Sequence, residues 1–138
     1  MLLFCVCGFV HGCGDAPSGG AVELSWALRD RTRGFVACTV ANIRKIRLDW
    51  TVGELRGFDT WPCDNNGVRQ GVTGFQVPVG DASLAISPEC ADGPASPDSY
   101  EAPAPIVRHI ELGGIVTLGA VVLAIELEET PTHPRICP

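Results

Sequence analysis

The chain has 138 residues, of which ten are lysine or arginine and sixteen are aspartate or glutamate, giving a formal net charge of -6. This length suits a single domain, and the acidic balance argues against nucleic acid as a partner, because binding to phosphates requires clustered cations. Eleven prolines and sixteen glycines favour short strands joined by turns over a bundle of helices.

The amino terminus begins with MLLFCVCGFV, a run without charge. It has the length of a signal-peptide hydrophobic region and is too short to span a membrane as a helix. The following VHGC, residues 10–13, resembles the signal of bacterial lipoproteins, in which cleavage precedes a lipid-bearing cysteine, although His11 stands where a small residue is usual. We therefore expect a signal peptide over residues 1–12, lipid on Cys13 and a flexible, glycine-rich tether over residues 13–20.

Two alternatives to this interpretation of the amino terminus stay open. Ordinary cleavage without lipid would give a secreted soluble protein, and an uncleaved internal strand or helix would give a protein that is not exported. The lipoprotein interpretation instead places the protein at the cell envelope, attached to the membrane through Cys13.

The cysteine count supports export. Loss of the leader and lipidation of Cys13 leave four of the seven cysteines, namely Cys38, Cys63, Cys90 and Cys137. An even number suits disulfides formed in an oxidising compartment. Four cysteines allow three pairings, of which we favour Cys38 with Cys63. No cysteine or histidine pair of the mature chain has metal-ligand spacing, so neither a metal nor another cofactor is expected.

Alternating apolar residues predict strands in the first half of the body. AVELSWAL, residues 21–28, and IRKIRLDWTV, residues 43–52, each place aliphatic residues and a tryptophan on one face. Residues 53–71 are rich in turn-forming residues and are predicted to be irregular. VTGFQVPV, residues 72–79, and SLAIS, residues 83–87, are predicted to be two strands linked by a tight turn at Gly80 and Asp81.

The second half begins with a segment rich in proline, residues 88–105, which is predicted to be a surface loop. IVRHIEL and IVTLGAVVLAIEL follow and are predicted to be a closing pair of strands joined at Gly113 and Gly114. The last strand has apolar residues on both faces, which predicts burial on both sides for part of its length. A proline-rich tail, residues 129–138, ends the chain and contains Cys137.

About seven short strands with almost no helix predict an all-β fold, a single antiparallel β-sandwich over residues 21–128. GFQVPVGDASLAISPEC resembles the strand, glycine turn and strand signature of carboxypeptidase regulatory-like and transthyretin-like sandwich modules, and IVRHIELGGIVTLGAVVL resembles their closing hairpin. With AVELSWAL, Cys38 and the PCD of residues 62–64, the chain also resembles small exported lipoproteins of myxobacteria. The resemblance implies an Ig-like or transthyretin-like sandwich and no catalytic residues, since such modules generally lack them.

The body of the sequence shows no nucleophile motif, so we do not expect an enzyme. We expect a non-catalytic structural or interaction module whose partner is an envelope protein or a glycan. The alternative is a small-ligand or carbohydrate-binding module that uses Trp61, with Phe58 beside it, and the loop of residues 88–105. Trp61 is predicted to be an exposed aromatic residue in a loop. His109 and Glu111 share a strand face, and we interpret them as a solvated pair in preference to a metal site.

Overall fold

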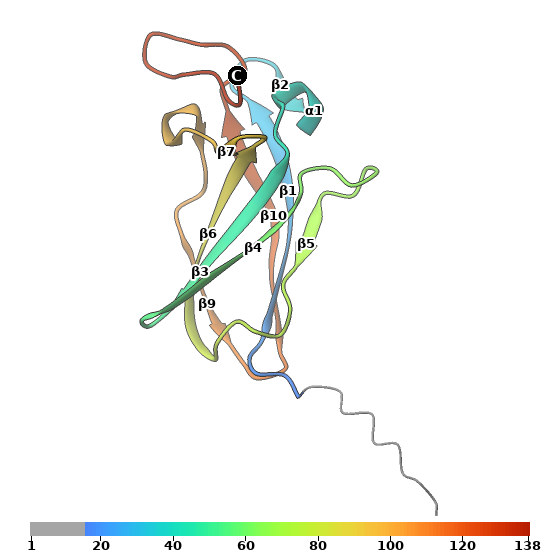
Figure 1. Cartoon of the computed structure of the whole chain (residues 1–138), viewed down its shortest axis with the longest axis vertical. Helices are drawn as coiled ribbons and strands as arrows, with labels where there is room; N and C mark the ends of the chain where they lie inside the picture. Colours follow the sequence, from blue (N-terminus) through green and yellow to red (C-terminus); the bar gives the residue numbers. More distant parts are fainter. Residues whose placement is uncertain (1–15) are drawn as a thin grey trace, which may run out of the picture.

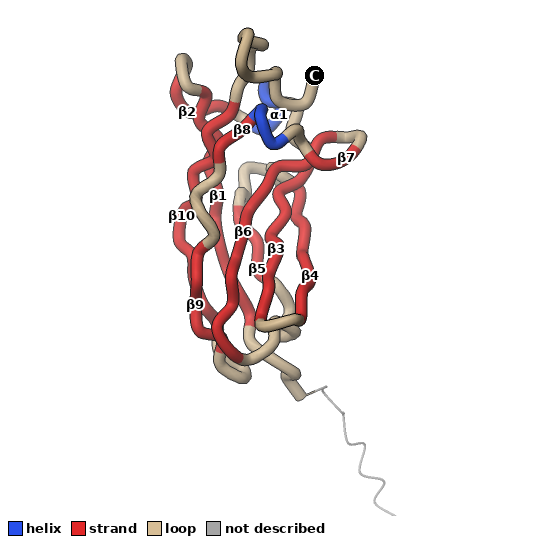
Figure 2. The backbone as a smooth tube through the Cα atoms, turned by 90° about the vertical axis from the view of Figure 1, so that its left-hand side faces the viewer, coloured by secondary structure: helices blue, strands red, loops and turns tan. Residues whose placement is uncertain are grey.

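The computed structural model describes residues 16–138, so the expected signal peptide and Cys13 lie outside the described residues. Strands are the main regular structure of the described chain and there is almost no helix, which confirms the predicted all-β class (Figure 1). Two five-stranded sheets lie face to face (Figure 2). The strands are β1 (Ala21–Asp30), β2 (Gly34–Val36), β3 (Lys45–Val52), β4 (Leu55–Pro62), β5 (Gln70–Val72), β6 (Gly80–Cys90), β7 (Gly93–Pro94), β8 (Tyr100–Glu101), β9 (Ile106–Ile110) and β10 (Ile115–Ile125). Two short helices, α1 (Cys38–Ala41) and the 3-10 turn η1 (Pro97–Ser99), lie between strands.

The first sheet has the order β2-β1-β10-β8, and β5 also pairs with β1. β1 and β10 run parallel, with Ala21 opposite Ile115 and Asp30 opposite Ile125. The prediction of a wholly antiparallel arrangement is therefore wrong at this pair. The remaining pairs of the sheet are antiparallel.

The second sheet has the order β4-β3-β6-β7, with β9 also paired to β6, and all of its pairs are antiparallel. β3 and β4 form a hairpin whose turn contains Gly53 with a φ of 58°, a conformation that glycine adopts without strain. The prediction that residues 53–71 are irregular is wrong for β4. This edge strand is mostly exposed or half-buried, so it lacks the alternation that marks a strand with one buried face.

Residues 72–79 do not form the strand that was predicted to precede β6. Only Val72 belongs to a strand, and further on Val77 makes an isolated bridge to Gly20. Val77 is fully buried, whereas Phe75 and Val79 are exposed, so the apparent alternation of these three residues does not describe a common buried face.

β9 and β10 do not form the predicted closing hairpin. β9 pairs with β6 in the second sheet, and β10 pairs with β1 in the first. The turn at Gly113 and Gly114 therefore carries the chain from one sheet to the other.

A β-bulge explains why β10 has apolar residues at both odd-numbered and even-numbered positions. Glu23 lies opposite Thr117 but Ser25 lies opposite Ala120, so β10 contains one extra residue at this point. Gly119, with a φ of 65°, lies in the bulge. The residues that pack on the core are Val116 and Leu118 before the bulge and Val121, Leu123 and Ile125 after it. Val122 is 40% exposed, so the prediction of a strand buried on both faces is wrong.

The core is one cluster of apolar side chains between the two sheets. Its largest fully buried aliphatic members are Leu28, Ile46, Leu48, Leu84, Ile110, Leu123, Ile125 and Ile136. Two disulfides join the elements at the end of the molecule that holds α1 and the carboxyl terminus (Figure 1). They link Cys38 to Cys63, the pairing favoured from the sequence, and Cys90 to Cys137.

The expected flexible tether, residues 13–20, is packed on the domain over its second part. Gly19 accepts a backbone hydrogen bond from Gly113 at 2.9 Å, and Gly20 exchanges backbone hydrogen bonds with Val77. Both glycines are buried, and a Cβ on Gly20 would lie 2.6 Å from the carbonyl oxygen of Glu111. Here glycine permits a close approach of two backbones, so the prediction of free movement is wrong for these residues.

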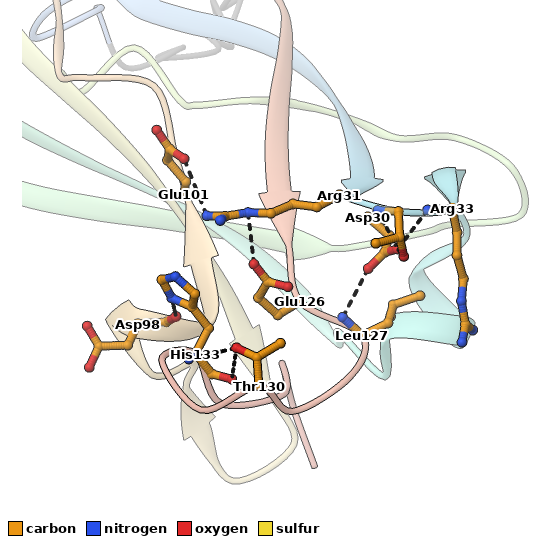
Figure 3. Close-up of polar contacts among 10 residues, drawn as sticks. Asp30, Arg31, Arg33, Asp98, Glu101, Glu126, Leu127, Thr130 and His133 are labelled. Carbon is orange, nitrogen blue, oxygen red and sulfur yellow. Dashed lines mark hydrogen bonds and ion pairs between the residues drawn. The ribbon is translucent and has the colours of Figure 1, made fainter.

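Polar contacts hold the proline-rich tail, residues 129–138, and the residues before it (Figure 3). The carboxylate of Asp30 accepts a hydrogen bond from the backbone of Leu127, and Arg31 pairs with Glu126 at 2.8 Å. His133 Nδ1 lies 3.1 Å from the carbonyl oxygen of Asp98. Together with the disulfide at Cys137, these contacts make the tail part of the folded domain.

Candidate functional site

The two aromatic residues expected to bind a ligand lie on opposite faces of β4. Trp61 is half-buried and stacks on Trp26, with ring centroids 6.2 Å apart. Its ring also covers Gly71 of β5, where a Cβ would collide with it. Trp61 therefore packs between the sheets and is not the exposed loop aromatic that was predicted.

Phe58 lies on the outer face of the second sheet, where its side chain is 55% exposed. It stands opposite Asp49 of β3, and a shallow groove of about 440 Å³ opens beside it. The lining residues are Arg47, Asp49, Trp50, Thr51, Arg56, Gly57 and Phe58. This groove is the candidate functional site.

Arg47 is held firmly at one side of the groove. Its guanidinium carbon lies 3.8 Å from the centre of the Phe58 ring, within the range of a cation–π contact. The guanidinium also donates hydrogen bonds to both carboxylate oxygens of Asp49, and its Nη1 lies 3.7 Å from Glu89. The hydrogen bonds to Asp49, with the charges of both carboxylates, raise the pKa of Arg47. Arg47 is therefore a fixed cation that orients Phe58.

Arg56 gives the groove a second cation. It lies on the same outer face as Phe58, because it precedes Phe58 by two residues on β4, and it is exposed. No ion pair of Arg56 occurs among the described residues. An exposed aromatic ring beside an unpaired guanidinium and the hydroxyl of Thr51 can bind a small polar molecule such as a sugar.

The loop of residues 88–105 does not form a single surface loop. It contains the end of β6, the short strands β7 and β8, and the turn η1. Two of its carboxylates already have partners, since Glu89 lies near Arg47 and Glu101 lies 3.6 Å from Arg31. Of these two carboxylates, Glu89 therefore lies next to a residue of the groove, Arg47.

His109 pairs across the sheet with Asp81 instead of along its own strand with Glu111. The ring Nδ1 lies 2.8 Å from the Asp81 carboxylate, and both side chains are exposed. The register of β6 and β9 brings these two residues together, and this register is a non-local property of the fold. Within residues 16–138, no group of three or more histidine, cysteine, aspartate or glutamate side chains is placed to hold a metal ion.

Comparison with known proteins adds a distant structural match. No family model and no curated protein matches the chain. Among solved structures, a leucine-rich repeat protein from Bacteroides thetaiotaomicron is similar over 77% of this chain at 12% identity and a TM-score of 0.39. The aligned region is only 12% of that protein. No helix among the described residues is long and apolar enough to cross a membrane.

Proposed function

We propose that the protein is a non-catalytic interaction module of the cell envelope, held at the membrane by lipid on Cys13. One observation carries this proposal: every cysteine of the described chain is in a disulfide, Cys38 with Cys63 and Cys90 with Cys137. Disulfides of this kind persist in proteins that are exported to an oxidising compartment. The folded domain therefore has no thiol left to pair with Cys13, which fits a cysteine reserved for modification.

The mass of the mature protein tests the anchor. We expect the protein extracted from membranes to begin at Cys13 and to carry acyl chains, because the motif at residues 10–13 resembles a lipoprotein cleavage signal. Intact mass spectrometry after detergent extraction measures this directly. A Cys13→Ser variant is the matched control and should lose both the lipid and the membrane association. Recovery of the wild type as an unmodified soluble chain would refute the anchor.

Partner binding is tested separately from anchoring. We propose that an envelope protein binds the domain through its loops. Proximity labelling in cells should then recover the same envelope protein repeatedly, and the Cys13→Ser variant should recover it less efficiently.

A second candidate function is the binding of a carbohydrate in the groove beside Phe58. Three features favour it: the exposed ring, the fixed Arg47, and Arg56, which forms no ion pair among residues 16–138. Phe58→Ala should weaken glycan binding about fivefold, because stacking on an aromatic ring contributes on the order of 1 kcal/mol. Phe35→Ala removes another exposed aromatic ring from the opposite sheet and is the control. A glycan array followed by calorimetry with any glycan that binds measures the effect, and equal binding by both variants would contradict this candidate.

A further inference from the structure

The amino-terminal segment joins the domain at the end opposite α1 and the carboxyl terminus (Figure 1). Several exposed apolar residues lie on the connections between strands at this end. The hydrogen-bond pattern places three connections there. Val77 of the β5–β6 connection bonds to Gly20, and Gly113 of the β9–β10 turn bonds to Gly19. Gly80 pairs with Ile110 and approaches Val52, which brings the β3–β4 turn to the same end.

Five large apolar residues on or beside these connections are between 42% and 65% exposed. They are Leu55, Phe75, Val79, Leu112 and Ile115. We name this group the apolar end. Single exposed apolar residues are ordinary on protein surfaces, but several at neighbouring turns mark a surface that can contact an apolar partner.

The chain before the domain is attached to the apolar end. Ser18 Oγ donates a hydrogen bond to the carbonyl oxygen of Phe75, and Gly19 accepts one from Gly113. Cys13 precedes Ser18 by five residues, which span at most about 18 Å when fully extended. A lipid on Cys13 is therefore confined close to this end.

We propose that the apolar end rests on the lipid surface to which the protein is anchored. The proposal depends on the lipid at Cys13 in the proposed function. A short tether gives the apolar end a high effective concentration at the bilayer, so even a weak contact is populated. Glu54 and Glu111 lie in two of the turns, and the cost of placing a carboxylate in hydrocarbon limits the contact to the headgroup level.

A matched pair of tryptophan reporters tests the contact. Phe75→Trp places the reporter at the apolar end, and Phe35→Trp places it on β2, at the opposite end of the domain (Figure 1). Mature protein extracted from membranes is reconstituted in phosphatidylcholine vesicles whose acyl chains are brominated close to the headgroup. Relative to the wild type, the fluorescence added by Phe75→Trp should be quenched and shifted to the blue, while that added by Phe35→Trp should be unchanged. Leu112→Trp supplies a second reporter at the apolar end in case the first variant folds poorly.

Flotation of the same vesicles separates the two proposals. Protein that floats with the vesicles but shows no quenching at position 75 or 112 is anchored without contact at the apolar end, which overturns this inference alone. Protein that does not float overturns both the anchor and the contact. Equal quenching of reporters at both ends also contradicts the inference, because it shows no preferred orientation.

Discussion

Removal of the Cys90–Cys137 disulfide is expected to lower the free energy of unfolding by about 4 kcal/mol. The bond joins residues 47 positions apart, and the unfolded chain gains the entropy of that loop when the bond is absent. It also fixes the tail, whose Ile136 is fully buried in the core. A Cys90→Ser, Cys137→Ser double variant should therefore lose stability through both the unfolded chain and the tail.

Urea denaturation followed by tryptophan fluorescence measures this loss. The Cys38→Ser, Cys63→Ser double variant is the matched comparison, because its bond closes a shorter loop of 25 positions. The loop entropy then predicts a loss of about 3.5 kcal/mol. Since small domains are commonly stable by only about 5–15 kcal/mol, either double variant should unfold at a clearly lower urea concentration. An unchanged unfolding midpoint for the first variant would show that the tail adds nothing to the stability of the domain.

Replacement of Asp30 by asparagine is expected to cost about 3 kcal/mol at neutral pH. The Asp30 side chain is nearly inaccessible, with the residue 3% exposed. Its carboxylate accepts hydrogen bonds from the backbone and hydroxyl of Thr32 and from the backbones of Arg33 and Leu127, at 2.7–3.1 Å (Figure 3). In an Asp30→Asn variant an NH2 group replaces one carboxylate oxygen. This group is itself a hydrogen-bond donor, so it cannot accept the hydrogen bonds that the lost oxygen accepted. Asp92→Asn, at an exposed position, is the control for the loss of one charge.

The effect of Asp30 on stability is also expected to depend on pH. Burial by itself raises the pKa of Asp30, but the hydrogen bonds from Thr32, Leu127 and Arg33 outweigh it, so the pKa lies below its ordinary value of 3.8. A group whose pKa is lowered by folding stabilises the protein above its unfolded pKa and loses this contribution as the pH falls through the folded pKa. The difference between the wild type and Asp30→Asn should therefore be full above about pH 5 and shrink below about pH 4. A difference that stays constant between pH 7 and pH 3 would contradict this role of the carboxylate.

Local patterns predicted those parts of the fold in which one face of a strand is buried. β1 and β3 each alternate between core and solvent, with Leu24, Trp26 and Leu48 buried, and both were predicted from that alternation. The alternation of apolar residues gave a wrong prediction where a bulge interrupts it. The extra residue at Gly119 moves the core-facing residues of β10 from even-numbered to odd-numbered positions. The resulting sequence pattern resembles that of a strand buried on both faces.

The remaining errors arise from contacts between distant parts of the chain. The turn at Gly113 has the sequence of a hairpin, and only the pairing of β9 with β6 and of β10 with β1 shows that it crosses between the sheets. Trp61 was predicted to be exposed because the sequence does not show its stacking partner, Trp26, which lies on the distant strand β1. The groove beside Phe58 likewise depends on the register of β3 and β4. Sequence suggested Phe58 as a candidate, but the role of Arg47 required the structure.

The parallel pairing of β1 with β10 has a consequence for how the protein is made. The first strand lies against the last along nearly its whole length, from Ala21 opposite Ile115 to Asp30 opposite Ile125. A chain that emerges progressively from a ribosome or a translocation channel cannot complete the first sheet until β10 has also emerged. Contacts between such distant residues form slowly, because the intervening chain must first be closed into a loop. During this interval the apolar face of β1 has no partner from β10, so the nascent chain is open to chaperones and proteases until its last strand arrives.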